Sequence, residues 1–358
     1  PPDRGDTARA PFPDTTGPGA VPPSGLEGRM MDFLLHPDDT AGKLLGMLVA
    51  IMAFVAVVGL ILLLLRLPKR LPRWVTVLGM LAPALVAMAF GLVYPALVTI
   101  DSSFRDRQGT QWVGLANYVQ AFTEGQFLIV LRNTVLWVVL VPLLATGVGL
   151  LYAALVDRTR FEKLAKTMVF LPMAISMVGA SIIWKFVYDN KVGLLSEVYV
   201  QFARLFGATD PTAPQWLLNS PWNNFFLIIV MVWIQAGFAM TVLSAAIKAI
   251  PDDIIEAARL DGLGGARLFR YITVPMIRPS LVVVLTTVAM ASLKAFDVVR
   301  TMTGGNYDTS VVANEFYTQS FTNQNRGLGS ALAVLLFIII IPVIAYNVRQ
   351  LKMSEDVR

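Results

Sequence analysis

Seven long apolar segments constrain this chain more than any other feature of its sequence. Each is long enough to cross the hydrocarbon core of a bilayer as an α-helix, which takes roughly 20 residues. The predicted spans are Leu44–Leu65, Val75–Ile100, Leu128–Val156, Thr167–Tyr188, Phe225–Lys248, Ser280–Arg300 and Gly329–Asn347. The composition, 56% hydrophobic and 15% charged, departs from that of soluble domains in the same direction. The sequence therefore predicts an all-α, polytopic helical membrane protein.

The remaining composition excludes several classes of site. The chain contains no cysteine, so it can form neither a disulfide nor a Cys-based metal site. Its one histidine, His36, lies in a polar N-terminal region and is expected to be a bystander. Residues 1–43 are predicted to be a disordered or peripheral segment, because Pro, Gly, Asp and Thr dominate most of it and bulky apolar residues are scarce there.

Lysine and arginine are concentrated in alternate connections between the spans. The connections after the first, third and fifth spans contain Arg66, Lys69, Arg70, Arg73, Arg158, Arg160, Lys163, Lys166, Arg259, Arg267, Arg270 and Arg278. The intervening connections, 101–127, 189–224 and 301–328, are poorer in positive charge. The positive-inside rule then places the first set, and with it the C-terminus, in the cytoplasm. The net charge of +5 reflects this topology, and no nucleic-acid partner is expected.

A polar, glycine-containing stretch, residues 250–275, separates the fifth and sixth spans. Its first part has the residues of a helix start, namely Pro251, Asp252 and Asp253. Three glycines predict the end of that helix: Gly262, Gly264 and Gly265. The helix would have about three turns, too few to cross a membrane. Small and polar side chains on its surface suit docking into a groove of another protein, although a simple connecting helix is the alternative.

The spacing within this stretch resembles the signature loop of bacterial ABC importer permeases. The matching residues are Glu256, Ala257, Ala258, Gly262, Ile272 and Pro275, with Val274 in place of the family's leucine. The resemblance implies that the helix docks in a cleft of a separate ATPase subunit and couples it to the spans. It assigns this coupling contact to Asp253, Glu256, Ala257, Ala258, Arg259, Asp261 and Gly262.

The resemblance extends over residues 75–351, which look like the six-helix core of the carbohydrate-uptake branch of these permeases. The supporting segments are Val113–Tyr118, Phe170–Pro172, Leu293–Asp297 and Thr303–Gly305. A short further match, Asn306–Thr309 with Ala313–Tyr317, is similar to α-glucoside permeases. Residues 44–66 would then form an extra transmembrane helix outside the shared core. The implied partners are a second permease chain, two ATPase subunits, an extracytoplasmic solute-binding protein and membrane lipid, in a bacterial inner membrane.

Polar and aromatic residues near the middle of the fifth span predict a solute site. Transporters hold their substrates near the bilayer midplane, and Trp233, Gln235 and Phe238 offer rings that stack on sugars and an amide that bonds hydroxyls. The resemblance adds Met173, Met177 and Ser292 at positions that contact sugar in the family. Ordinary helix packing is the alternative for these apolar side chains. The chain departs from the family's pattern at several such positions, so an identical sugar pose is not implied.

Lys294, Asp297 and Arg300 are three residues apart, which predicts one face of the sixth span. Charges inside a membrane are costly and are usually paired or turned toward water. Lys294 and Asp297 are therefore interpreted as a structural pair that lines the cavity, with direct contact to the solute as the alternative.

No phosphate-binding G-x-x-x-x-G-K-[ST] motif is present, so ATP and Mg are expected on the partner subunits and no cofactor on this chain. No catalytic set is evident either, and an enzyme is not predicted. The predicted function is ATP-driven import of a di- or oligosaccharide, in particular an α-glucoside such as maltose, trehalose or sucrose. A permease for another solute, such as glycerol phosphate, and an ion-coupled secondary transporter remain as alternatives.

Overall fold

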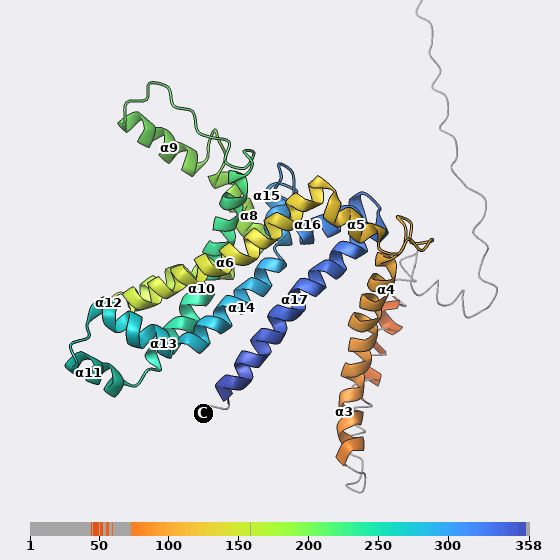
Figure 1. Ribbon diagram of the computed structural model, residues 1–358, viewed down its shortest axis with the longest axis horizontal. Helices are drawn as coiled ribbons and strands as arrows, with labels where there is room; N and C mark the ends of the chain where they lie inside the picture. The colour runs from red at the N-terminus through yellow and green to blue at the C-terminus, as the bar shows by residue number, and fades with distance from the viewer. Residues whose placement is uncertain are drawn as a thin grey trace, which may run out of the picture. The chain divides into compact units, whose positions relative to one another are not determined.

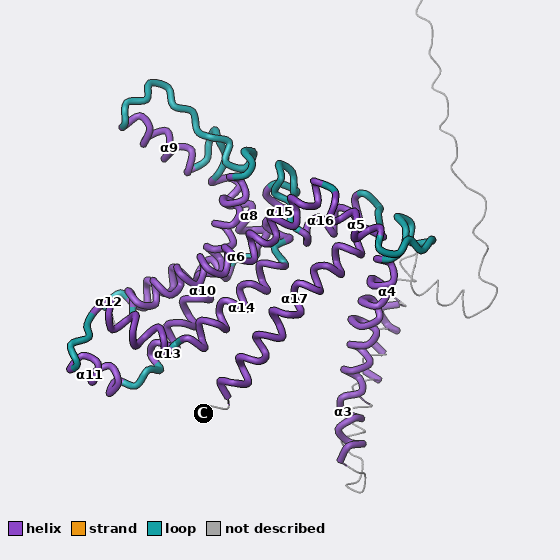
Figure 2. Tube along the Cα trace, in the orientation of Figure 1, coloured by secondary structure: helices purple, strands orange, loops and turns teal. Residues whose placement is uncertain are grey.

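The computed structural model describes residues 73–157 and 159–355, together with scattered positions between 44 and 59. These residues are predominantly helical, and the described ranges contain one isolated β-bridge, between Arg105 and Trp112, but no strand (Figure 2). The predicted all-α fold is confirmed. Residues 1–43 and most of the first predicted span lie outside the described residues, although the described positions 46–49 of that span are helical.

The described chain divides into two units, one ending at Val93 and one running from Tyr94 onward. The first contains α3 (Arg73–Met88) and the π-helical turn η1 (Ala89–Val93). The second begins with α4 (Tyr94–Ser103), α5 (Ala116–Thr123), α6 (Gly125–Val156), α7 (Glu162–Phe170), the 3₁₀ turn η2 (Leu171–Ala174), α8 (Met177–Val187), α9 (Leu194–Leu205) and α10 (Trp222–Lys248) (Figure 1). It continues with α11 (Asp252–Leu260), α12 (Gly265–Leu268), η3 (Phe269–Thr273), α13 (Val274–Met276), α14 (Arg278–Leu293), α15 (Phe296–Met302), α16 (Val312–Tyr317), η4 (Thr318–Thr322) and α17 (Arg326–Glu355).

Helices long and apolar enough to cross a membrane match most of the predicted spans. Four are single helices, namely Val77–Ser103, Gly125–Val156, Trp222–Lys248 and Arg326–Tyr346. Two further candidates are bent pairs of helices, which bring the total to six among the described residues. The six spans predicted for the core each have a counterpart, but two of them are not the straight helices expected.

The fourth predicted span, Thr167–Tyr188, is broken. The helical segments on either side of the break, Glu162–Ala174 and Met177–Val187, meet at 104°. Pro172 lacks the N–H that a continuous helix needs, and Ser176 starts a new helix by accepting a hydrogen bond from the Gly179 N–H at 3.1 Å. The sixth span is bent as well, because Gly265–Met276 meets α14 at 72°. The second half of the predicted 250–275 loop is therefore helical.

Helix α10 forms the centre of the second unit. It packs against α6, α7 and α14, and its buried side chains include Leu227, Met231 and Leu243. Glycines allow two of these contacts: a Cβ on Gly149 of α6 would lie 2.6 Å from the Met240 backbone nitrogen, and one on Gly237 would lie 2.6 Å from the Val169 carbonyl oxygen. Small residues bring helix backbones together in this way in membrane proteins.

The connections gather at two ends of this bundle. Figure 1 places α11 and α12 at one end, and α9, α15 and α16 at the other. The connection from α6 to α7 meets α11 at the first end, because Asp157 and Arg259 line the same recess. Two connections that were predicted to share the cytoplasmic side therefore lie together. Their assignment to that side still rests on the distribution of Lys and Arg.

A tight turn at the opposite end is fixed by buried asparagines. Tyr307 and Asp308 have φ values of 57° and 58°, which non-glycine residues rarely adopt. The Asn223 amide donates to the Tyr307 carbonyl at 2.7 Å. The Asp308 carbonyl accepts from Asn133 at 2.6 Å and from Asn224 at 3.0 Å. Side chains of α6 and α10 thus satisfy the backbone of the 301–311 connection where it has no regular structure.

Candidate functional site

Local chemistry defines both ends of α11, the helix predicted to couple the chain to a partner. Pro251 is its N-cap residue, and Asp252 and Asp253 lie in the first turn, where acidic side chains favour a helix start. At the other end Gly262 has a φ of 84°. The Gly262 N–H donates to Arg259 and the Leu263 N–H to Ala258, both at 3.0 Å, which is a Schellman motif. The predicted start and stop are confirmed, with nine residues in the helix.

Helix α11 buries one face and exposes the other. Ile255 and Ala258 pack inward, and Ala258 is 6% exposed. The predicted contact residues Glu256, Ala257, Arg259, Asp261 and Gly262 are exposed. Leu260 is 88% exposed and Ile254 is 37% exposed. The exposed face therefore combines charged, small and apolar side chains.

A recess of about 150 Å³ lies beneath α11. Its lining comes from the ends of α6 and α10, the connection to α11, α11 itself, and the ends of α12 and η3. The residues are Ala153, Ala154, Asp157, Ile247, Lys248, Ile250, Ile255, Arg259, Leu268 and Thr273. The recess joins the predicted coupling helix to two charged residues of the spans, Asp157 and Lys248.

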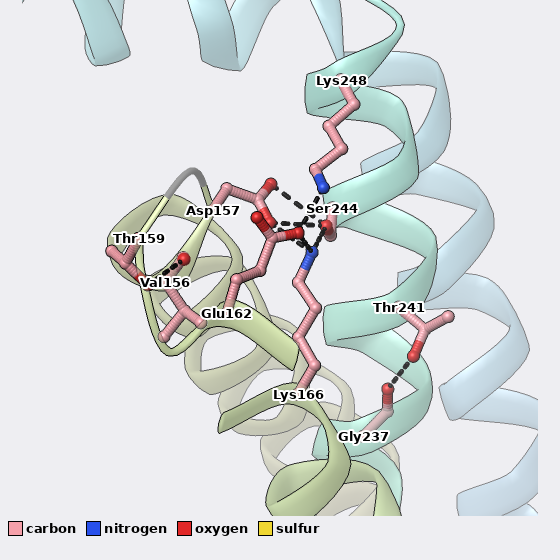
Figure 3. Close-up of polar contacts among 9 residues, drawn as sticks. All are labelled: Val156, Asp157, Thr159, Glu162, Lys166, Gly237, Thr241, Ser244 and Lys248. Carbon is pink, nitrogen blue, oxygen red and sulfur yellow. Dashed lines mark hydrogen bonds and ion pairs between the residues drawn. The ribbon is translucent and has the colours of Figure 1, made fainter. Parts of the chain in front are cut away.

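Those two residues belong to a polar cluster that joins α6, α7 and α10 (Figure 3). Lys166 of α7 forms ion pairs with Asp157 and, at 2.9 Å, with Glu162. Ser244 of α10 donates to both carboxylate oxygens of Asp157, at 2.8 and 3.0 Å, and accepts from Lys166. Lys248 completes the cluster by pairing with Glu162. We call these five residues the α7–α10 clamp.

The clamp was not predicted from the sequence. Lys166 was expected only to help set the orientation in the membrane, and no role was predicted for Asp157, Glu162, Ser244 or Lys248. One signal was present, since Glu162 and Lys166 are four residues apart on a helix, the spacing of a stabilising pair. The contacts with α10, however, join residues 78 to 87 positions apart in the sequence.

The centre of α10 contains the predicted solute residues Trp233, Gln235 and Phe238, all half-buried. The Trp233 ring packs edge-on against Trp184 of α8, with centroids 5.6 Å apart. Rings continue from there through Tyr188, Phe226 and Trp216 to Tyr199 on α9, with successive centroids 5.1 to 5.7 Å apart. Trp233 therefore takes part in packing, the alternative considered for it, while part of its surface stays accessible.

Met173 and Met177 lie at the bend between α7 and α8. Met173 belongs to the 3₁₀ turn η2 and is 40% exposed, and Met177 is the first residue of α8 and packs against the core. The backbone of α7 touches α10 beside this bend, at Gly237. The bend and the centre of α10 are therefore neighbours, which agrees with placing both sets of residues in one region.

The other predicted solute residues lie differently. Ser292 is 3% exposed, and its hydroxyl donates to the Val288 carbonyl at 2.8 Å. The hydroxyl hydrogen is therefore bonded within α14 and does not point toward a solute. The prediction that Lys294 and Asp297 share one face of a continuous helix is wrong. Helix α14 ends at Leu293 and α15 begins at Phe296, and no ion pair joins the two side chains among the described residues.

Aromatic contacts hold the helix that follows this break. Phe296 lies against Tyr317 with ring centroids 5.1 Å apart, and the Arg300 guanidinium carbon lies 4.7 Å from the Tyr317 centroid. A continuous helix would change the direction in which Phe296 and Arg300 point. Lys294 instead lines a largely apolar cavity of about 420 Å³ together with Phe296 and Tyr317, and Asp297 lies in the first turn of α15, where it complements the helix dipole.

Comparison with known proteins identifies the family. The osmoprotective compounds uptake permease protein GgtC of Synechocystis sp. is 45% identical over 282 residues, 77% of this chain and 99% of the relative. The α-glucoside transport system permease protein AglF of Rhizobium meliloti is 42% identical over 276 residues, 75% of this chain and 80% of the relative.

A solved bacterial alginate ABC transporter contains a chain of the same fold, with a TM-score of 0.65 and 21% identity over 76% of this chain and 92% of that one. At that identity the likeness shows the fold alone. The family model described as the inner membrane component of binding-protein-dependent transport systems matches residues 66–351. The chain therefore belongs to this family of ABC importer permeases, whose members are membrane transport subunits rather than enzymes, with ATP hydrolysis left to partner ATPases.

Proposed function

We propose that this chain is the permease of an importer for an α-glucoside, and that α11 docks on an ATPase subunit. The observation that carries the docking role is the exposed face of α11. It presents Glu256, Ala257 and Leu260 to solvent on a helix whose length, start and stop are set by its own sequence. Leu260, 88% exposed, adds an apolar side chain to the charged and small residues of this face.

The proposed assembly follows from the family. Binding-protein-dependent transport requires an extracytoplasmic solute-binding protein, and a chain without a nucleotide site requires separate ATPase subunits. A second permease chain would complete the path across the membrane. In this arrangement the α11 end of the bundle and the C-terminus face the cytoplasm, as the Lys and Arg distribution predicts, and the turn at Tyr307 faces the outside.

The solute class is inferred from two sources. The relative at 42% identity is named for α-glucoside transport, and the one at 45% for osmoprotective compounds. The centre of α10 offers rings and an amide, which suit a neutral polyhydroxylated solute. A phosphorylated solute such as glycerol phosphate calls for Arg or Lys at the phosphate. Trp233, Gln235 and Phe238 provide no cation, and Lys294 lines a separate, largely apolar cavity with Phe296 and Tyr317. This arrangement favours a neutral sugar.

Receptor binding is the direct test of the solute class. The cognate solute-binding protein, titrated calorimetrically with maltose, trehalose, sucrose and glycerol 3-phosphate, is expected to bind one of the disaccharides and not the phosphate ester. The reconstituted importer should then accumulate the same sugar in an ATP-dependent manner. Exclusive binding of the phosphate ester, or uptake driven by an ion gradient with this chain alone, would disprove the proposal.

Replacement of Trp233 tests the proposed solute region. Trp233→Ala is expected to lower sugar uptake at subsaturating concentration by about twofold to tenfold, because an aromatic contact is worth about 0.5–1.5 kcal/mol and 1.4 kcal/mol corresponds to a factor of about ten. Trp233→Phe should retain most of the uptake. Trp184→Ala is the control, since it removes the packing partner but lies outside the proposed contact set. Equal losses in Trp184→Ala and Trp233→Ala would assign Trp233 to packing alone.

A further inference from the structure

The clamp lies between the helix that would receive force and the region that would bind solute. Its residue Lys248 ends α10, and Pro251, the N-cap residue of α11, follows three positions later. In the other direction, α7 leads from Glu162 and Lys166 to the bend that contains Met173 and Met177. Asp157 and Lys248 also line the recess beneath α11 together with Arg259. Motion of α11 therefore reaches the clamp before it reaches the solute region.

The clamp resists separation of α7 from α10. The Asp157 side chain is 7% exposed, and its partners are Lys166 and the Ser244 hydroxyl. Pulling α7 away from α10 would separate Lys166 from Ser244 and Glu162 from Lys248. Because Asp157 follows α6, which packs on α10, the separation would also take Lys166 from this little-exposed carboxylate, which is strongly unfavourable for a buried charge. A second attachment lies along the same pair of helices, where the Val169 carbonyl and Phe170 rest against Gly237.

We propose that the clamp makes α7 move with α10 as one body, so that the coupling element of this permease is α11 together with α7. Displacement of α11 then moves the Met173–Met177 bend and the centre of α10 together. The two sides of the solute region therefore keep their positions relative to each other. Lys166 is a positioning residue in this scheme. The inference rests on the proposed docking of α11 and adds the route by which docking acts.

A covalent link tests this idea in the complete importer. The chain has no cysteine, and Thr167 and Thr241 line a recess of about 410 Å³ between α7 and α10. Their hydroxyls donate within their own helices, to Lys163 and Gly237, so cysteines there remove no contact between the helices. Linking Thr167→Cys to Thr241→Cys with a flexible bismaleimide should leave sugar uptake by proteoliposomes within about twofold of the unlinked protein. A change of that size is smaller than the effect of a typical coupling between two sites, which is about fivefold or more. Arrest of transport by the link would overturn the proposal.

A charge variant supplies the complementary test. Lys166→Met should reduce the amount of sugar transported per ATP hydrolysed by about tenfold, within the range of measured couplings between sites. Lys166→Arg keeps the charge and should retain coupling. Lys163→Met, on the exposed side of the same helix, is the matched control. The probe is radiolabelled maltose, trehalose or sucrose, whichever of these sugars the solute-binding protein binds.

The bismaleimide link should restore coupling to Lys166→Met, because it replaces the lost ionic attachment. A folding defect would not respond to the link. Unchanged transport per ATP in Lys166→Met, or no rescue by the link, would overturn the role of the clamp. A separate variant, Glu256→Lys on the exposed face of α11, tests the docking itself. If it abolishes activity, the docking of α11 stands whatever the clamp variants show, so failure of this inference and failure of the proposed function are distinguishable.

Discussion

Glu256→Lys is expected to abolish solute-stimulated ATP hydrolysis and uptake while the permease still inserts and folds. Glu256 is exposed on the outer face of α11, and the described part of the chain provides it with no hydrogen-bond or ionic partner. Lysine and glutamate have similar helix propensities, so the helix itself should persist. Losing one partner of a buried interfacial charge pair costs about 2–5 kcal/mol, enough to reduce the docked population by about thirtyfold or more.

The measurement is ATP hydrolysis by the reconstituted importer, with and without sugar-loaded binding protein. A charge reversal of the same size at the opposite end of the bundle, Glu197→Lys on α9, is the control, and it should affect ATPase docking far less. Co-purification of the ATPase subunits with the Glu256→Lys permease reports directly on the contact. Normal stimulation and normal co-purification in this variant would remove α11 from the coupling role.

The sequence predicted best those features that depend on neighbouring residues. The start of α11 follows from Pro251 and two acids, and its end follows from Gly262, the residue type that adopts a positive φ without strain. The existence of the six core spans follows from apolar length, although the bends in two of them do not. In each case the deciding interactions lie within a few residues, so the sequence contains the whole cause.

Features that depend on distant contacts could not be predicted. The break at Lys294 has no Gly or Pro beside it in the sequence, and Phe296 and Arg300 meet Tyr317 only in the folded chain. The clamp is a sharper case, since Asp157 and Ser244 become neighbours only after α6 and α10 have packed. The bend at Pro172 lies between these extremes. Its proline was visible in the sequence, but the 104° angle depends on Ser176 and on the approach of α7 to α10.

The close contact of α7 with α10 leads to the second prediction with a large expected effect, which concerns the stability of the permease rather than its coupling to ATP hydrolysis. Gly237→Ala and Gly237→Val are expected to destabilise the permease progressively. The first added carbon would lie 2.6 Å from the Val169 carbonyl oxygen and 3.1 Å from the Phe170 Cα, both backbone atoms that cannot move independently. Replacing glycine in a helix gains at most about 1 kcal/mol of propensity. Overpacking costs about 1–3 kcal/mol and sometimes more, so the steric cost should prevail.

The same substitutions at Gly147 of α6 are the matched control, because a Cβ there meets nothing within 4 Å. The thermal midpoint of the detergent-purified importer should fall in the order wild type, Gly237→Ala, Gly237→Val, by roughly 2–4 °C per kcal/mol on the scale of domains of 150–250 residues. The Gly147 variants should stay close to wild type. If Gly237→Val were as stable as Gly147→Val, the backbones of α7 and α10 would not be in contact, and the clamp would have no adjoining contact to reinforce it.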